Sequence, residues 1–514
     1  MARRWKGAAL AIPLALAQAC MVGPNYKTPS AKVAEGWMAP PAAATPVVSQ
    51  RPLNAMDAYW WKAFRDPVLD ELVEAAFQNN LTLQIAGTRV LKARAELNYA
   101  IGNLFPQQQG LSGGIDYGGV GKPVATNVAS DNVLFAATWE IDVWGKIRRG
   151  IEADEAAYLG TMASYDDALV TTIADVASSY VNLRTAEERI RVAARNVETQ
   201  RESLRVATVQ YDYGEKSELD VRQAEALLAQ TEAQIPVLRN LARQAKNALA
   251  VLLGETPDAV EARLSVPAPI PVAPAEATVG IPRDLLRRRP DVRSAGLAAA
   301  SQSALIGVAV ANMYPAFSLS GSFGLSSSTM GQSTLLDMFT WPARVFQIGA
   351  SFLWPIFNYG RLVNQVRVQD ATFQGAVLNY QNVVLNAQRE VENGLSAFAT
   401  SREAMDRLQK ASTSATRATY LSLLQYKAGE TLYTTVVTAE QTQLAIQDSL
   451  ASMKGNVALG LIAVYRALGG GWELRGDRDV VSDAVKAEMA RRTSWGDMLE
   501  IQEHIPAVSP VEEP

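Results

Sequence analysis

The chain has 514 residues, a hydrophobic fraction of 48% and a formal net charge of −4, so it lacks the basic balance typical of nucleic-acid-binding proteins. It contains one histidine, His504, which leaves little room for histidine metal sites or general bases. We find no glycine-rich phosphate loop at a strand–helix junction and no nucleophile elbow. We therefore predict that the protein is not an enzyme and has no catalytic residue, no cofactor and no metal site.

The N-terminus has the pattern of an export signal, which we place at residues 1–19. Three basic residues among the first six precede an apolar stretch from Ala8 to Ala17, which is too short to span a bilayer as an anchor. Next comes Cys20, the only cysteine, which therefore cannot form an internal disulfide. Residues 16–20 resemble a bacterial lipobox, although Ala17 stands where leucine is usual and Gln18 is uncommon. Cys20 is the predicted lipidation site, and an ordinary signal followed by an incidental cysteine is the alternative.

Two segments of strict alternation follow a helical stretch, and the same order recurs later in the chain. Between Val133 and Val143 every second residue is apolar, and residues 110–117, 317–326 and 346–356 alternate in the same way. Period two over about ten residues is the length and pattern of a tilted membrane-spanning β-strand, apolar towards lipid and polar towards a lumen. A half-buried sheet of a soluble protein is the alternative. The side chains predicted to face lipid include Phe135, Trp139, Phe352 and Trp354.

The number of these strands has a consequence for assembly. Four strands cannot close a barrel, because known membrane barrels begin at about eight, and open sheet edges are not tolerated in lipid. If the strands span a membrane, several chains must share one barrel. The residues alone allow a dimer, a trimer or a tetramer.

The longest predicted elements are helical. No proline occurs from Lys146 to Ile235 or from Ile356 to Ile505, and apolar residues between Leu169 and Tyr211 recur with the spacing of a coiled coil. A helix from Arg148 to Tyr211 would be roughly 95 Å long. Each run turns at Gly214 or Gly429 and returns through a second helix. The sequence thus predicts a long α-hairpin twice per chain.

A constant offset of 215 residues relates the two halves, since Gln210-Tyr211 returns as Gln425-Tyr426 and Gly214 as Gly429. An offset held over about 110 residues indicates one structural unit, duplicated with its lengths fixed. The predicted organisation is a signal peptide (1–19), an extended lipidated segment (20–58), repeat 1 (59–256), a Pro-rich linker (257–281), repeat 2 (282–471) and a partly disordered C-terminal tail (472–514).

Four motifs, taken in order, resemble the outer membrane efflux proteins of the TolC family, in the lipoprotein branch that serves resistance-nodulation-division (RND) pumps. They are Cys-Met-Val-Gly-Pro-Asn-Tyr at 20–26, Trp-Trp-Lys-Ala-Phe-Arg-Asp-Pro at 60–67, the stretch from Gln210 to Glu225, and Leu-Leu-Arg-Arg-Arg-Pro-Asp-Val-Arg at 285–293. The likeness covers nearly everything from Met1 to about Gly471. Each motif is weak alone, but their order together with the duplication is specific.

The resemblance implies an α+β fold, in which a homotrimeric outer-membrane β-barrel with four strands per chain continues into a long periplasmic α-helical barrel. It implies a passive exit duct of a tripartite efflux system for small molecules such as drugs and toxic compounds. The partners would be further copies of the chain, an inner-membrane RND pump, a periplasmic membrane-fusion adaptor and outer-membrane lipid, and not nucleic acid. The protein would be lipid-anchored in the bacterial outer membrane.

The resemblance also implies that the hairpin ends dock the adaptor and form the gate. Resembling ducts often carry an acidic residue before an Ala-Gln or Ala-Glu pair near the pore constriction, where this chain has Thr438. Thr434 and Thr438 are therefore the gate candidates, and an ordinary solvated helix face is the alternative. The predicted docking residues are Tyr211, Gly214, Leu219, Gly429, Leu432 and Tyr433.

Two other functions remain open at this point. The same fold resembles exit ducts for type I protein secretion, which carry a different cargo; the lipobox and the Gly-Pro-Asn-Tyr motif favour small-molecule efflux. A purely periplasmic coiled-coil scaffold without a pore is the second alternative, and the alternating strands argue against it.

Overall fold

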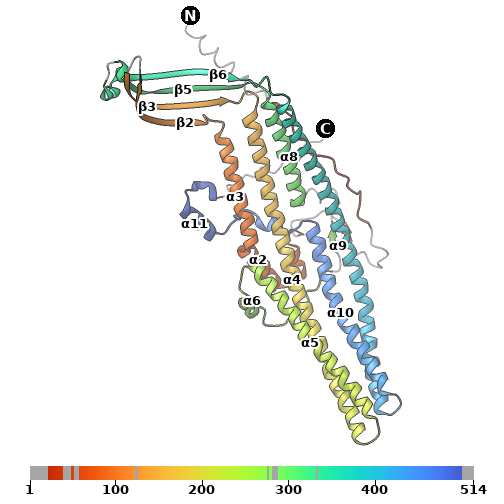
Figure 1. Ribbon diagram of the computed structural model, residues 1–514. Coiled ribbons are helices and arrows are strands. Elements are labelled where there is room, and N and C mark those ends of the chain that lie inside the picture. Colours follow the sequence, from red (N-terminus) through yellow and green to blue (C-terminus); the bar gives the residue numbers. More distant parts are fainter. Residues whose placement is uncertain are drawn as a thin grey trace. The chain divides into compact units, whose positions relative to one another are not determined.

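A computed structural model describes residues 21–38, 48–50, 57–121, 126–274, 277–279, 288–331 and 334–500. The chain divides into two compact units, and the long helices α4 and α9 contribute residues to both (Figure 1). The first unit consists of Met1–Ser30, Val90–Thr161 and Ser294–Gln381, and the second of Ala31–Arg89, Met162–Arg293 and Asn382–Pro514.

The first unit contains a four-stranded antiparallel sheet, whose strands lie side by side in the order β2-β3-β5-β6 (Figure 1). The central pairing of β3 with β5 joins the two repeats, with Phe135 opposite Phe323. The four alternating segments are thus confirmed as strands. Their bounds are Gln108–Val120 for β2, Thr126–Ile141 for β3, Ala316–Ser328 for β5 and Arg344–Leu353 for β6.

Two strands end earlier than their alternation predicts. β3 stops at Ile141, and β6 stops at Leu353, so Trp354 lies just beyond the strand on which it was expected. Pro355 follows, and proline cannot donate to a strand ladder. The Trp354 indole N–H instead donates to the carbonyl of Met313 at 3.1 Å.

The sheet carries apolar side chains in rows across its strands. One row runs through Leu111, Phe135, Phe323 and Phe346, each opposite the next in register, and all four side chains are exposed. The neighbouring row on the other face runs through Ala136, Ser322 and Gln347. The two faces therefore differ in polarity, as the alternation predicts.

The long helical hairpins are also confirmed. Helices α4 (Lys146–Asp212) and α9 (Arg361–Lys427) have 67 residues each, about 100 Å at a rise of 1.5 Å per residue. They return through α5 (Glu218–Leu253) and α10 (Tyr433–Ala467). In the second unit α10 also packs along α4, so that each hairpin contacts the other within one chain (Figure 1).

Each repeat begins with helices. Repeat 1 has α2 (Pro67–Asn79) and α3 (Leu81–Gly102), and repeat 2 has α8 (Pro290–Ala311). By length and composition α8 could cross a membrane. Its small residues, however, bring other helices close: a Cβ at Gly307 would meet the side chain of Arg149 in α4, and one at Gly296 the ring of Tyr380 in α9. Such close neighbours on two sides are typical of a core helix.

The N-terminal segment, the linker and the tail contain further elements of the second unit. A short helix, α6 (Pro257–Arg263), lies within the Pro-rich linker, and β1 (Val48–Gln50) pairs in parallel with β4 (Ala277–Val279). The tail forms α11 (Asp483–Arg492), and its Val480 carbonyl lies so close to Gly87 that a Cβ there would be 2.0 Å away. Residues 472–500 are therefore structured, and residues 501–514 lie outside the described residues.

Candidate functional site at the hairpin ends

The two hairpins reverse direction through matching turns. Gly214 has φ +74° and Gly429 has φ +77°, a left-handed conformation that glycine adopts without steric cost. In each turn the glycine N–H donates to a tyrosine carbonyl three residues earlier, that of Tyr211 at 2.8 Å and that of Tyr426 at 3.0 Å. A Cβ would meet nothing within 4 Å at either position. Backbone conformation, rather than crowding, therefore requires glycine in both turns.

The predicted docking side chains divide into two groups. Tyr211, Leu219 and Leu432 are 43%, 60% and 73% exposed, so they are accessible on the described surface. Tyr433 is 1% exposed, and the expectation that it is an accessible contact is wrong. Its ring packs edge-to-face on Tyr426, with centroids 4.9 Å apart.

The buried tyrosines form a joint between the hairpins. The Tyr426 hydroxyl, at the end of α9, donates to Asp220 Oδ2 in α5 at 2.9 Å. Burial and Asp220 both raise the pKa of Tyr426, so the phenol stays protonated and keeps donating. The repeat-related residue Tyr211 is exposed instead. The joint packs in one cluster of Val206, Ala207, Val221, Ala224, Tyr426, Tyr433 and Val436.

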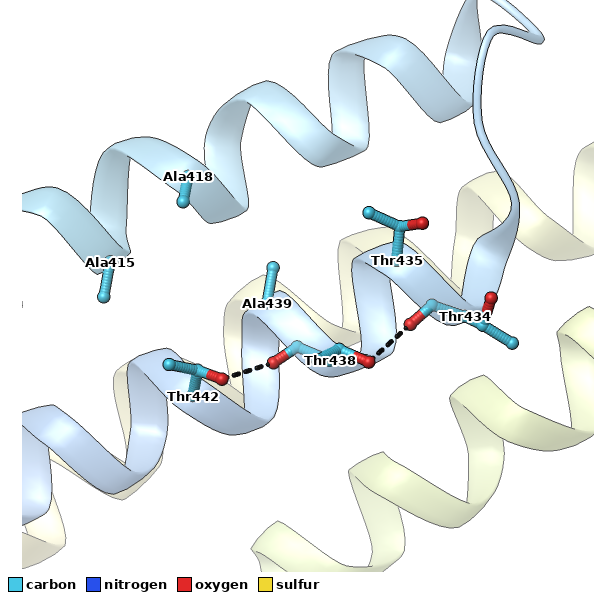
Figure 2. Close-up of a pocket in the computed structure, with 7 residues that line it drawn as sticks. All are labelled: Ala415, Ala418, Thr434, Thr435, Thr438, Ala439 and Thr442. Atoms are coloured by element: carbon cyan, nitrogen blue, oxygen red, sulfur yellow. Dashed lines mark hydrogen bonds between the residues drawn. The ribbon is translucent and has the colours of Figure 1, made fainter.

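The gate candidates line a shallow hollow on the second hairpin (Figure 2). Thr434 and Thr438 are exposed, and both belong to α10. The hydroxyls are used within the helix, because Thr438 Oγ1 donates to the Thr434 carbonyl at 2.8 Å and Thr442 Oγ1 to the Thr438 carbonyl at 2.7 Å. The hollow has a volume of about 480 Å³ and is lined without a charged residue by Ala415, Ala418, Thr434, Thr435, Thr438, Ala439 and Thr442.

A buried carboxyl lies directly after this hollow in α10. Glu440 is 2% exposed and accepts a hydrogen bond from Ser203 of α4. Burial raises its pKa from the ordinary 4.5 to about 7. Nothing in the local sequence distinguishes Glu440 from Glu225, the equivalent residue of repeat 1, which is exposed and pairs with Arg222.

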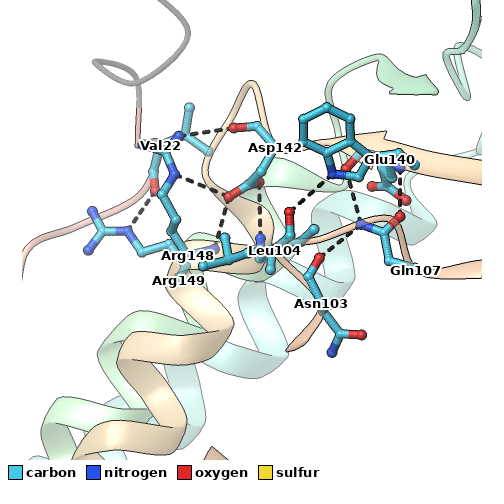
Figure 3. A network of polar contacts seen from close by, with 10 residues as sticks. Val22, Asn103, Leu104, Gln107, Glu140, Asp142, Arg148 and Arg149 are labelled. Atoms are coloured by element: carbon cyan, nitrogen blue, oxygen red, sulfur yellow. Dashed lines mark hydrogen bonds and ion pairs between the residues drawn. The ribbon is translucent and has the colours of Figure 1, made fainter. Parts of the chain in front are cut away.

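The junction between strands and helices holds the N-terminal segment (Figure 3). Asp142 caps α4 by accepting from the backbone N–H groups of Ile147 and Arg148 at 3.0 and 2.9 Å. The buried Arg149 guanidinium donates to the Val22 carbonyl at 3.1 Å and to the Asn25 side chain at 2.8 Å. Residues 22–25 are therefore fixed at the start of α4. Cys20 itself lies outside the described residues.

The predicted lipid-facing side chains lie in the first unit. Phe135, Trp139 and Phe352 are on β3 and β6. Phe135 and Phe352 are 48% and 68% exposed, and the Trp139 indole N–H donates to the Leu104 carbonyl at 3.1 Å. A tryptophan with one polar contact and an apolar body is typical of a membrane boundary.

The chain is similar to known proteins over most of its length. The family model described as outer membrane efflux protein matches residues 72–255 and 281–470. Nodulation protein T of Rhizobium leguminosarum bv. trifolii is 30% identical over 465 residues, which cover 89% of this chain and 96% of the relative. Pyoverdine export outer membrane protein OpmQ of Pseudomonas aeruginosa is 30% identical over 436 residues, 80% of this chain and 87% of the relative. The solved outer-membrane channel OprN has a TM-score of 0.81 and 31% identity, covering 88% of this chain and 100% of that one.

Proposed function

Because this chain belongs to the outer membrane efflux protein family, we propose that it acts as a homotrimeric, lipid-anchored exit duct whose hairpin ends dock an adaptor and gate the pore. The resemblance inferred from the four motifs is confirmed, and the protein is an outer-membrane component of an efflux system. Its family is one of channels rather than enzymes. A passive duct needs a pump. In this proposal an inner-membrane RND pump supplies the energy, and a periplasmic adaptor joins the pump to the duct.

The two edge strands of the sheet support a trimer, because each can pair with a strand of another copy. β2 and β6 are each paired on one side among the described strands. Antiparallel order would continue if β6 of one copy paired with β2 of the next. Three copies of a four-stranded sheet give a closed barrel of twelve strands, and closure removes the edges that lipid does not tolerate. The choice of three copies comes from the resemblance to the family, since the strands alone also allow two or four copies.

The apolar rows support membrane insertion of that barrel. The Leu111, Phe135, Phe323 and Phe346 row is exposed over all four strands. A contiguous apolar surface of this kind marks a membrane or protein interaction site. Small polar residues on the other face fit a water-filled lumen.

Deletion and complementation test this function. A strain that lacks the chain should become more susceptible to a panel of small toxic compounds, and plasmid-borne chain should restore resistance. The restored protein should fractionate with the outer membrane as a heat-resistant trimer. Loss of a secreted polypeptide without any change in susceptibility would favour type I secretion, and a soluble periplasmic protein would contradict the duct.

Substitution at Thr438 tests the gate. In a threefold ring, each carboxylate added per chain places three negative charges in one narrow plane. Thr438→Asp should therefore raise the preference for cations in single-channel recordings, whereas Thr413→Asp, at an exposed threonine of α9 outside the hollow, should raise it less. Conductance and ion selectivity unchanged by Thr438→Asp would place this residue away from the lumen.

A further inference from the structure

The contact between α4 and α10 alternates apolar and polar layers. The helices run antiparallel, because Arg189 of α4 pairs with Asp448 of α10 while Ser203, further along α4, contacts Glu440. Between these two polar layers, Asn196 donates to Gln447 at 2.8 Å and accepts from Gln443 at 3.3 Å. Val192, Leu444 and Ala451 form an apolar layer near Arg189 and Asp448. The aliphatic residues of the tyrosine joint form another beyond Ser203, towards the hairpin ends.

The layer around Glu440 is the least satisfied of these. Glu440 Oε2, the Tyr433 hydroxyl and both amide atoms of Gln200 are buried and have no hydrogen-bond partner among the described residues. Gln200 lies one turn before Ser203 on the same buried face of α4. We call Gln200, Ser203, Tyr433 and Glu440 the Glu440 layer. Buried polar groups without partners favour any rearrangement that admits water.

Burial and the Ser203 hydroxyl are the two influences on the pKa of Glu440, and neither is a cation. The helix opposite, α4, presents Ser203 and the neutral Gln200. On α10 itself the nearest titratable group is Tyr433, whose pKa is raised by burial and then by Glu440, Tyr426 of α9 and Asp220 of α5. The groups that raise the pKa of Tyr433 are therefore neutral or negative, and the cation Lys216 lies over the ring of Tyr426, with its Nζ 5.3 Å from the ring centroid. Ionisation of Glu440 adds an uncompensated charge to a buried contact.

We propose that the Glu440 layer is a proton-controlled latch, which holds α10 against α4 while the Glu440 carboxyl is protonated and lets the two helices separate locally once it ionises. The inference rests on the proposed duct, because α10 also carries the gate candidates Thr434 and Thr438. Local separation at Glu440 would move that face of α10. The latch would thus couple the state of the gate to the pH of the periplasm.

The direction of the pH effect follows from the two protonation equilibria. Packed Glu440 has a pKa of about 7, and exposed Glu440 would return to the ordinary 4.5. Between these values the packed arrangement binds more protons, so it loses stability as the pH rises from 4.5 to 7 and changes little above that. Each unit of pKa difference corresponds to about tenfold in the equilibrium. The fraction of open latch should rise at least tenfold between pH 4.5 and pH 8.

Hydrogen–deuterium exchange on the purified full-length protein tests the latch. Glu440→Gln keeps the shape and removes the titration, and wild type and variant are compared at the same pH so that intrinsic exchange rates cancel. Amides of residues 436–447 should exchange at equal rates in both proteins at pH 4.5. At pH 8 wild type should exchange at least tenfold faster. In planar bilayers the open frequency of wild type should rise over the same window, while that of Glu440→Gln stays at its low-pH level.

Two further variants keep the test decisive. Glu225→Gln, at the repeat-related exposed position, should retain the wild-type pH profile. Ser203→Ala removes the hydrogen bond that lowers the pKa of Glu440, so it should move the transition to higher pH even if Glu440→Gln does not assemble. Equal exchange rates of wild type and Glu440→Gln at pH 8, or an unmoved transition in Ser203→Ala, would overturn the latch. Exchange does not require conduction, so a failed duct and a failed latch give different results.

Discussion

At the scale of single residues, glycines have two different roles in the hairpins. Gly214 and Gly429 occupy left-handed turns with open space around the missing Cβ. Gly455 lies inside α10 in ordinary helical conformation, and a Cβ there would be 2.2 Å from Thr185 Oγ1 of α4. The first two glycines serve the backbone, and the third permits a close approach of two helices.

Substitution of Gly455 separates these roles. Gly455→Ala should overpack the contact between α4 and α10 and lower the free energy of unfolding by about 1–3 kcal/mol, measured by thermal unfolding in detergent. The double variant Gly455→Ala/Thr185→Ala removes the Thr185 side-chain atoms nearest to the added methyl, and it should recover most of that loss. Gly375→Ala, in α9 with nothing within 4 Å, is the matched control and should not destabilise the protein. Equal stability of wild type and Gly455→Ala would contradict the close approach.

At the scale of elements, periodicity predicts which strands and helices form, but it predicts neither their exact ends nor which single side chains are buried. Alternation located all four strands, yet β6 stops before Pro355. Helical spacing located both hairpins, yet it could not distinguish exposed Leu432 from buried Tyr433, since the ring of Tyr426 covers the latter. Glu440 was not predicted, because its burial depends on α4, some 240 residues earlier in the chain. The residues around Glu440 in the sequence do not indicate that a helix so distant in the chain buries it.

The accessible hairpin ends lead to a prediction about docking. Leu219 and Leu432 are exposed beside the turns, so an aspartate there should fold and yet place a charge in an apolar interface. Leu219→Asp or Leu432→Asp should reduce efflux in a susceptibility assay while trimer abundance stays normal. Val237→Asp, at an exposed apolar position of α5 away from the turn, is the control and should leave efflux unchanged. A fall in trimer abundance alone would make the ends structural rather than a docking surface.

At the scale of the whole molecule, the proposed duct would have two independent attachments to one membrane, a lipid anchor at Cys20 and spanning strands. The segment after Cys20 is fixed by backbone as well as side-chain contacts. The Val22 N–H donates to the Trp144 carbonyl at 3.1 Å, and a Cβ at Gly145 would meet Met21. These contacts place Met21 and Val22 where β3 leads into α4, and acyl chains on Cys20 would be a second attachment in the proposed duct. Burial of acyl chains contributes about 0.8 kcal/mol per CH₂ group.

Cys20→Ala separates the two attachments. The variant should lose labelling by radioactive palmitate, because Cys20 is the only cysteine in the chain. It should still fractionate with the outer membrane as a trimer, since the exposed apolar rows of the sheet remain. Arg149→Gln, which weakens the hold on residues 22–25, is the matched control and should keep the label. Labelling that survives in Cys20→Ala would exclude lipidation at this site, whereas loss of the variant from the outer membrane would show that the strands alone do not hold the protein there.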